Sequence, residues 1–317
     1  MPFDFSINDE SIFPIITLQD TTNNTFAEIY AFGALLNKFS KVHDGQQVNV
    51  IEGFKNAEDA KANITPIFQS AKLSPFPCRI KNSKYHFGEA DHKLTKYFDD
   101  HDNAMHGLIC DQVFSVIETV ATDDYAKVTL QYVYDNPAEG YPFSYRCEVE
   151  YCLKKDNTLC IKTIITNIDD QLIPIADGWH PYFTLGDPVD DCQLEFQSKE
   201  MLEFTPTLIP TGKLIPYQEF GSIKTMGFTS FDNCFTVNFA ECQPLVVFRN
   251  PKRKIQVEIH PAPSYPYLQF FTPAHRKSIA IENLSAAPDA FNNFMGLHVL
   301  EPKESVSFAT KFVIKSL

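Results

Sequence analysis

The sequence has no apolar run approaching the ~20 residues that a membrane-spanning helix needs. Its first ten residues are acidic, and no basic region with an apolar stretch behind it stands there, as a secretory signal would require. Basic residues are also scarce, because 27 Lys and Arg stand against 40 Asp and Glu, a formal net charge of −13. Such a charge repels nucleic acid and anionic membranes at long range. We therefore expect a cytoplasmic protein with no nucleic-acid or membrane partner.

The eight cysteines include no CxxC pair, the spacing that most often marks a zinc site or a redox centre. Cys147, Cys152 and Cys160 fall inside strand-like runs, where a thiol is usually a small buried apolar group. A disulfide framework is typical of much smaller secreted chains than this one of 317 residues. We expect neither a structural metal nor disulfide bonds.

Helical periodicity is also scarce, and residues 56–63 are the one short helical candidate. Period-two alternation dominates instead, as in residues 145–153 and, after a polar turn, residues 159–166, which together predict a hairpin. Further strand-like runs lie at residues 15–18, 26–32, 128–134, 255–259 and 306–314. Many strands joined by polar turns, with no linker or repeat, predict an all-β fold, a large antiparallel β-sandwich forming one domain over residues 1–317.

Glu282 is the candidate base that the sequence singles out most clearly. It ends the short apolar run 278–281 and is followed by a loop of small residues, Pro, Asp and Asn. A carboxylate held by a strand at the mouth of such a loop is rigidly placed at the rim of a pocket, and small residues let a ligand approach closely.

His180 is the second candidate, in the segment Gly178-Trp179-His180-Pro181. Pro181 favours an extended backbone at the residue before it. Trp179, the single tryptophan of the chain, offers a flat face of the kind on which sugar C–H groups pack. A core tryptophan beside a buried histidine is the alternative reading.

Charged residues in apolar surroundings form a third group. Arg79 stands in a Pro-rich apolar stretch and needs a carboxylate or a ligand, because a buried unpaired cation is costly. Asp232 leads into an apolar strand, where it serves either a ligand or its own turn. His106 lies in the turn-like segment Asn103-Ala104-Met105-His106-Gly107. The basic turn 252–254 is a solvated hairpin tip or, less favourably, a phosphate site.

Taken in order along the chain, these segments resemble the aldose 1-epimerase (galactose mutarotase-like) family. The resemblance spans roughly residues 26–314 and rests on seven segments, at residues 76–80, 103–107, 178–183, 231–235, 267–273, 280–293 and 300–305. Leu108 stands where well-studied galactose mutarotases have a second Gly, and Gly-Trp-His-Pro surrounds the histidine in place of their Thr-Asn-His type of segment. The chain therefore looks like a member of a divergent subgroup.

The resemblance implies a galactose mutarotase-like supersandwich with an open cleft. It also implies roles for individual residues, with Glu282 as general base and His180 as general acid. Arg79, His106 and Asp232 match residues that hold the ring oxygen and hydroxyls of the sugar. Two neighbours complete the expected substrate-binding set, Asn103 and Trp179. The implied reaction, exchange of the anomers of an aldose, needs no cofactor and no metal.

Three other functions stay open from the sequence. The first is a non-catalytic sugar-binding or regulatory protein on the same fold. The second is a glycoside-cleaving enzyme that uses two carboxylates, for which Glu282 and Asp232 are the candidates. The third is a mutarotase for hexose 6-phosphates, whose phosphate would need a cationic cluster such as residues 252–254. The sequence is compatible with a monomer or a homodimer.

Overall fold

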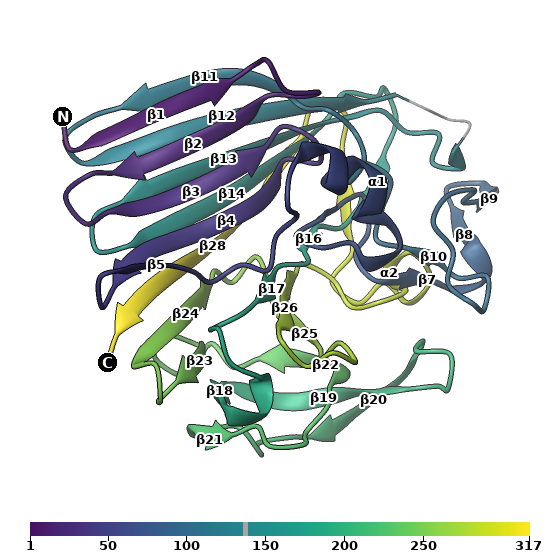
Figure 1. Ribbon diagram of the computed structural model, residues 1–317. Coiled ribbons are helices and arrows are strands. Elements are labelled where there is room, and N and C mark those ends of the chain that lie inside the picture. The colour runs from purple at the N-terminus through teal and green to yellow at the C-terminus, as the bar shows by residue number, and fades with distance from the viewer. Residues whose placement is uncertain (136–138) are drawn as a thin grey trace.

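The computed structural model describes residues 1–135 and 139–317, and antiparallel sheets make up most of it. Two sheets form the layers of the sandwich on the side of both termini (Figure 1). The first has five strands, β1 (Phe3–Asn8), β2 (Ile15–Asp20), β3 (Thr25–Tyr30), β4 (Leu35–His43) and β5 (Gln46–Asn49). The second has nine strands in the order β11 (Ser115–Ala121), β12 (Tyr125–Tyr134), β13 (Tyr145–Lys154), β14 (Thr158–Asn167), β28 (Ser305–Ser316), β24 (Ile255–Pro261), β23 (Val246–Asn250), β18 (Gln193–Phe196) and β21 (Lys224–Thr225).

A third sheet of eight strands carries three of the candidate site residues, Glu282, Asp232 and Trp179. Its order is β20 (Pro210–Pro216), β19 (Ser198–Phe204), β22 (Asp232–Val237), β25 (Tyr267–Phe271), β26 (Ile279–Leu284), β16 (Gly178–Trp179) and β6 (Lys72–Leu73), and β17 (Tyr182–Phe183) also pairs with β26. Three two-stranded ladders complete the strands, β7 (Arg79–Ile80) with β10 (Ala104–Met105), β8 (Lys84–Phe87) with β9 (Ala90–Lys93), and β15 (Ile173–Ile175) with β27 (His298–Leu300).

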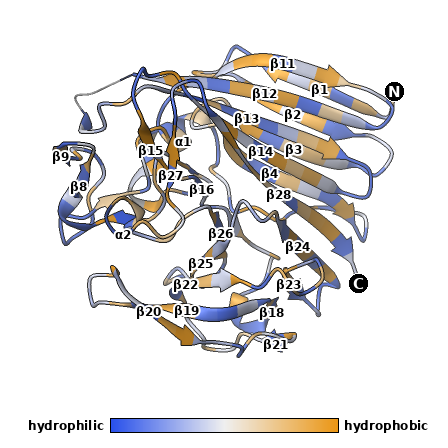
Figure 2. Cartoon of the chain, turned by 180° about the vertical axis from the view of Figure 1, so that it is seen from behind, coloured by the Kyte–Doolittle hydropathy of each residue, from blue (hydrophilic) through white to orange (hydrophobic). Residues whose placement is uncertain are grey.

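The alternating runs of the sequence form strands as predicted. In β13, the side chains of Tyr145, Cys147, Val149, Tyr151 and Leu153 are all buried. Figure 2 shows the alternation of hydrophobic and hydrophilic residues along this region of the nine-stranded sheet. The buried faces of the two terminal-side sheets share one core cluster, because each strand turns every second side chain toward the other layer. The predictions of an all-β sandwich and of the hairpin β13–β14 are confirmed.

The predicted helix is present as α1 (Ala57–Ile67) and is longer than the sequence pattern suggested. The Asn56 side chain caps it by accepting a hydrogen bond of 2.8 Å from the Asp59 backbone N–H. Thr65 leaves helical geometry because the residue before a proline disfavours it, and the helix ends at Phe68 in a left-handed conformation. Other helical elements among the described residues are short, for example α2 (Ala290–Asn293) and the 3₁₀ turns η1 (Lys81–Ser83) and η3 (Val189–Asp191).

Within the described residues, no helix combines the length and the apolar character needed to cross a membrane. The cysteines of these residues are free thiols, and Cys147 and Cys152 are buried while Cys160 is partly exposed. Cys147 and Cys152 therefore pack as small apolar groups, as expected, whereas Cys160 does so only in part.

Candidate active site

Three neighbouring strands bring polar side chains together in the eight-stranded sheet. Asp232 begins β22, Gln269 lies in the middle of β25, and Glu282 lies inside β26, which continues to Leu284 rather than ending at the carboxylate. Gln269 and Glu282 are direct cross-strand partners. The Gln269 side-chain amide donates a hydrogen bond of 2.9 Å to Asp232 Oδ1. Register alone therefore places two carboxylates and one amide side by side.

His180 approaches this row from the short connection between β16 and β17. Its Nε2 lies 3.3 Å from Glu282 Oε1, and both side chains are almost fully buried. The ring of Tyr182 stacks on the imidazole with a centroid separation of 4.9 Å and an interplanar angle of 20°. The structure thus brings together the two residues that the sequence proposes as acid and base.

His106 and Arg79 come from the β7–β10 ladder, where the chain turns sharply. Cys78 and His106 both have positive φ angles, 51° and 56°, and the His106 backbone N–H donates a 2.8 Å hydrogen bond to the Cys78 carbonyl oxygen. The following Gly107 could not carry a Cβ, because that atom would lie 2.1 Å from the Ser74 carbonyl oxygen. The tight turn holds the His106 ring edge-on to the His180 ring at 5.0 Å between centroids.

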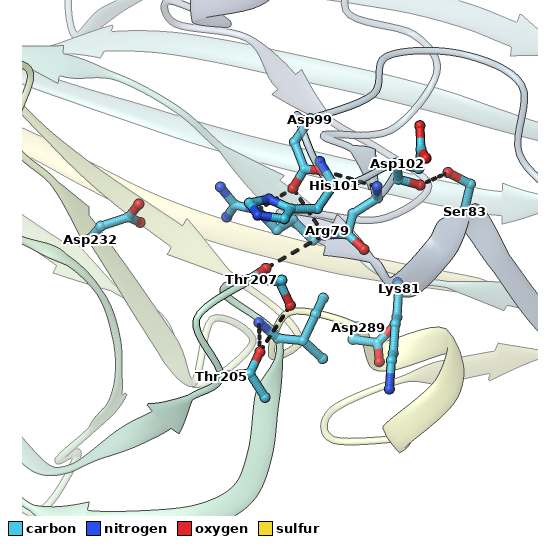
Figure 3. A network of polar contacts seen from close by, with 12 residues as sticks. Arg79, Lys81, Ser83, Asp99, His101, Asp102, Thr205, Thr207, Asp232 and Asp289 are labelled. Carbon is cyan, nitrogen blue, oxygen red and sulfur yellow. Dashed lines mark hydrogen bonds and ion pairs between the residues drawn. The ribbon is translucent and has the colours of Figure 1, made fainter.

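Arg79 is oriented by Asp99 (Figure 3), since its Nε lies 3.0 Å from Asp99 Oδ2. Asp99 in turn accepts hydrogen bonds from the backbone N–H groups of His101 and Asn103, at 2.9 and 3.0 Å. The Asn103 side-chain amide donates a third, of 3.0 Å, to Asp99 Oδ2. Arg79 therefore enters the pocket already held at one edge of its guanidinium group.

The pocket is lined by Ile67, Phe68, Cys78, Arg79, Met105, His106, His180, Tyr182, Asp232, Gln269, Phe271 and Glu282. Its cavity volume of about 190 Å³ is below the range of about 300–1,000 Å³ usual for drug-sized ligands. Half of the lining side chains are polar or charged and half are apolar or aromatic. Such a mixture suits a small, polar molecule with C–H faces.

Two predicted sugar-binding residues do not line this pocket. Trp179 is a core residue instead, because side chains alternate along an extended segment and its neighbour His180 takes the pocket side. Its ring packs edge-on against Tyr151 at 5.9 Å, and the Lys72 ammonium lies 4.2 Å from its centroid. Asn103 is buried behind Arg79, where it serves Asp99. Neither residue is therefore among those that line the pocket, and direct sugar contact at these two positions stays an untested expectation.

Burial shifts the pKa values of the ionisable side chains that line the pocket. It raises the pKa of Glu282 well above its ordinary value, and the nearby Asp232 charge adds to this effect. Burial lowers the pKa of His180 to about 4 and that of His106 well below 6.5. Burial also raises the pKa of Asp232, against the opposing charge of Arg79. Such opposed shifts in one cleft are typical of groups that exchange protons with a substrate.

Several buried polar atoms of the pocket have no hydrogen-bond partner within residues 1–135 and 139–317. They include Glu282 Oε2, His106 Nδ1 and Gln269 Oε1. Unpartnered buried polar atoms are costly, and a polar ligand that supplied donors and acceptors would satisfy them. His106, His180 and Glu282 are also the residues best placed to hold a metal ion, since their ligand atoms lie within 4.8 Å of one another.

The basic turn 252–254 lies outside the pocket. Its Arg253 forms a bidentate pair with Asp187, with Nε–Oδ2 and Nη2–Oδ1 distances both of 2.9 Å. This turn joins β23 to β24 in the nine-stranded sheet, so it does not supply the cationic cluster that a hexose 6-phosphate would need in this pocket.

Sequence reasoning missed Asp99 and Gln269 as contributors to the site. Gln269 had a visible signal, because it is the single polar residue in the run Leu268-Gln269-Phe270-Phe271. Asp99 stands in the acidic turn that precedes Asn103, where turn formation alone explains a carboxylate. Tyr182, one of three aromatic residues that line the pocket with Phe68 and Phe271, lies three residues beyond Trp179.

Comparison with known proteins places the chain in a family. The family model described as aldose 1-epimerase matches residues 14–313. The chain belongs to the aldose 1-epimerase family. The uncharacterized protein YihR of Escherichia coli (strain K12) is 26 % identical over 234 residues, which cover 72 % of this chain and 73 % of YihR.

Solved structures agree with this family fold. A galactose mutarotase-like protein from Clostridium acetobutylicum has a TM-score of 0.88 at 17 % identity, covering 100 % of this chain and 99 % of its own. The galactose 1-epimerase of Lactobacillus acidophilus has a TM-score of 0.83 at 18 % identity, covering 99 % and 98 %. The low identities fit a divergent subgroup, as the sequence resemblance suggested.

Proposed function

We propose that this family member is an active aldose 1-epimerase, which interconverts the α and β anomers of an aldose. The observation that carries the proposal is the 3.3 Å contact between His180 Nε2 and Glu282 Oε1 inside a small polar pocket. The anomeric hydroxyl and the ring oxygen of a pyranose are bonded to the same carbon. Two catalytic groups must therefore be close neighbours to reach both oxygens at once.

The reaction uses two proton transfers. Glu282 takes the proton of the anomeric hydroxyl while His180 gives a proton to the ring oxygen. The C1–O5 bond breaks, its electron pair goes to O5, and O1 becomes the carbonyl oxygen of the open-chain aldehyde. Rotation about C1–C2 and closure on the other face, with the two roles reversed, give the other anomer.

The active form of the pair holds one transferable proton in addition to the N–H of a neutral imidazole. Burial raises the pKa of Glu282 and lowers that of His180, which favours the neutral forms of both side chains. In this proposal the proton of the free protein therefore lies on the Glu282 carboxyl group beside a neutral imidazole. Moving the proton to His180 keeps the total unchanged and produces the base and acid that ring opening needs. A bound sugar favours this charged form, because its hydroxyls hydrogen-bond to the carboxylate.

The other pocket residues bind the sugar in this proposal. The guanidinium of Arg79, the Asp232 carboxylate and the His106 ring hold hydroxyl groups, and Gln269 steadies Asp232 through their 2.9 Å hydrogen bond. The stacked Tyr182 ring takes the packing role that the sequence assigned to Trp179. The pocket contains two carboxylates, and the basic turn 252–254 lies outside it. Both observations favour a neutral sugar over a phosphorylated one.

Acid–base assistance of this kind contributes on the order of 10²–10⁴ in rate, or about 3–5 kcal/mol of barrier. The test is anomer-exchange NMR on glucose, galactose and a hexose 6-phosphate. We expect exchange above the spontaneous rate for a neutral aldose and a loss of most of it in Glu282→Gln and His180→Asn. Saturable sugar binding without exchange would point to a sugar-binding protein, and release of reducing ends from an oligosaccharide would point to a glycosidase.

A further inference from the structure

A fully buried ion pair lies behind the pocket, and the proposed chemistry does not use it. Lys72 Nζ contacts Asp177 Oδ1, and neither side chain has any exposed surface. The ammonium also donates a hydrogen bond of 3.2 Å to the Gly178 carbonyl oxygen. The Tyr265 hydroxyl donates one of 2.7 Å to Asp177 Oδ2. Removing two charges from water costs several kcal/mol per ion, so a pair like this is weak evidence for stability and calls for another role.

The pair connects the strands that carry the catalytic residues. Asp177 precedes β16 directly, and its backbone N–H donates to Ser285 Oγ at 2.8 Å. The Ser285 backbone N–H returns a hydrogen bond of 2.8 Å to the Asp177 carbonyl oxygen. Ser285 follows β26, the strand of Glu282, and Lys72 lies in β6 on the other side of β16. The ion pair thus joins β6 to the residue before β16, and the hydrogen bonds between Asp177 and Ser285 extend this link to the end of β26.

The same segments hold the backbone of His180. Its N–H donates a hydrogen bond of 3.1 Å to the Ala71 carbonyl oxygen, and its own carbonyl oxygen accepts one of 3.0 Å from the Ser70 N–H. Both partners immediately precede Lys72 in the chain. The position of His180 therefore depends on how the segment 70–73 is aligned with the segment 177–180.

Alignment here decides which side chain enters the pocket. A shift of one residue would turn every side chain of the segment to the opposite face, so Trp179 and His180 would exchange places. Strands β6 and β16 have only two residues each, and a short ladder specifies its register weakly. The observed register pairs Trp179 with Lys72 and Gly178 with Leu284, and it brings the two buried charges into contact.

We propose that the Lys72–Asp177 ion pair is a register lock that keeps His180, and not Trp179, in the pocket. The two residues are then positioning residues for the acid–base pair. The kinetic part of this inference rests on the proposed function, whereas its spectroscopic part does not. A shift in register would turn Asp177 to the opposite face and leave the buried Lys72 ammonium without its partner, which is the costly state that excludes the shift.

The test is the double variant Lys72→Met, Asp177→Leu. Replacing both charges by apolar side chains leaves no unpaired buried charge, so the fold is expected to survive. The turnover number per folded molecule should fall about 10²-fold, since a displacement of about 1 Å at a catalytic group has this effect. KM should stay within about twofold, because Arg79 and Asp232 come from β7 and β22 and keep their places.

Trp179 reports the register directly, because it is the single tryptophan of the chain and is buried. In the double variant its fluorescence emission should shift to longer wavelength, and acrylamide should quench it faster than in the wild type. This readout needs no substrate. A wild-type protein without mutarotase activity, together with this change in Trp179, would refute the proposed function and leave the register lock standing.

The matched control is Lys155→Met, Asp124→Leu, which removes an exposed ion pair of 2.6 Å and should change neither turnover nor emission. Wild-type turnover and wild-type emission in the Lys72–Asp177 double variant would overturn the inference. If that variant does not fold, Tyr265→Phe removes one hydrogen bond to Asp177 and keeps the shape of the ring. A severalfold lower turnover with faster quenching supports the lock, and no change in either overturns it.

Discussion

The buried histidine of the proposed acid–base pair predicts how stability depends on pH. His180 has a pKa of about 4 in the folded protein, against 6.5 for an unperturbed histidine, because burial disfavours its charged form. Between these two values the unfolded chain binds a proton at this site and the folded chain does not. The free energy of unfolding therefore falls as the pH is lowered through this window.

The size of the effect follows from the shift. Each pKa unit corresponds to about 1.36 kcal/mol, so the gap between 6.5 and about 4 corresponds to about 3 kcal/mol. In His180→Asn this contribution is absent. When the pH falls from about 7 to about 4, the free energy of unfolding should therefore decrease by about 3 kcal/mol less in the variant than in the wild type. His106, whose pKa is also lowered by burial, contributes to the pH dependence of both proteins.

The assay is urea unfolding at half-unit pH steps, followed by circular dichroism so that it needs no substrate. The comparison uses the slope of the free energy of unfolding against pH, not its absolute value, because the substitution also changes packing. His86→Asn, at a histidine outside the pocket whose side chain is 65 % exposed, is the control for the substitution itself. Parallel curves for wild type and His180→Asn would refute a buried, neutral His180.

Two further predictions concern the pocket. Asp99→Asn removes the charged partner that orients Arg79 at 3.0 Å. In steady-state kinetics KM should rise about tenfold, which corresponds to about 1.4 kcal/mol, while turnover stays nearly unchanged. A fall in turnover without a rise in KM would contradict this prediction. Added Zn²⁺ should inhibit the enzyme by binding His106, His180 and Glu282. The 3.3 Å between His180 Nε2 and Glu282 Oε1 matches the ~3.3 Å expected between two ligand atoms that each lie ~2.0–2.1 Å from a tetrahedral zinc ion. EDTA should restore the rate, and a protein that EDTA inactivates would contradict it.

Much of the sandwich could be predicted from the sequence because long strands carry a strong signal. The alternation in residues 145–153 fixes one face of β13, and β13 and β14 then pair over their full length. The site is different, because its elements are short. Strands β7, β10, β16 and β17 have two residues each, and no periodicity can be read from two residues.

The candidate residues could be recognised in the sequence from the chemistry of their side chains, but the contacts that they make depend on backbone conformations that the sequence does not show. The left-handed conformations of Cys78 and His106 place two side chains of the site, yet neither residue type announces such a conformation. The sequence does not show which face of a two-residue strand turns inward, so it could not show that Tyr182 lines the pocket and Trp179 does not. Asp99 acts through Arg79, whose apolar surroundings predicted a carboxylate or a ligand as partner but did not show which carboxylate.

The central claim is that Glu282 and His180 together open the sugar ring, and exchange NMR on Glu282→Gln tests it most directly. The variant keeps the size of the side chain but removes its proton-transfer chemistry, and Glu203→Gln, on a partly exposed glutamate outside the pocket, is the matched control. The account predicts that the wild type and Glu203→Gln accelerate the exchange of at least one neutral aldose, and that Glu282→Gln lowers this rate by about 10²–10⁴. Exchange at the wild-type rate in a folded Glu282→Gln protein would contradict it.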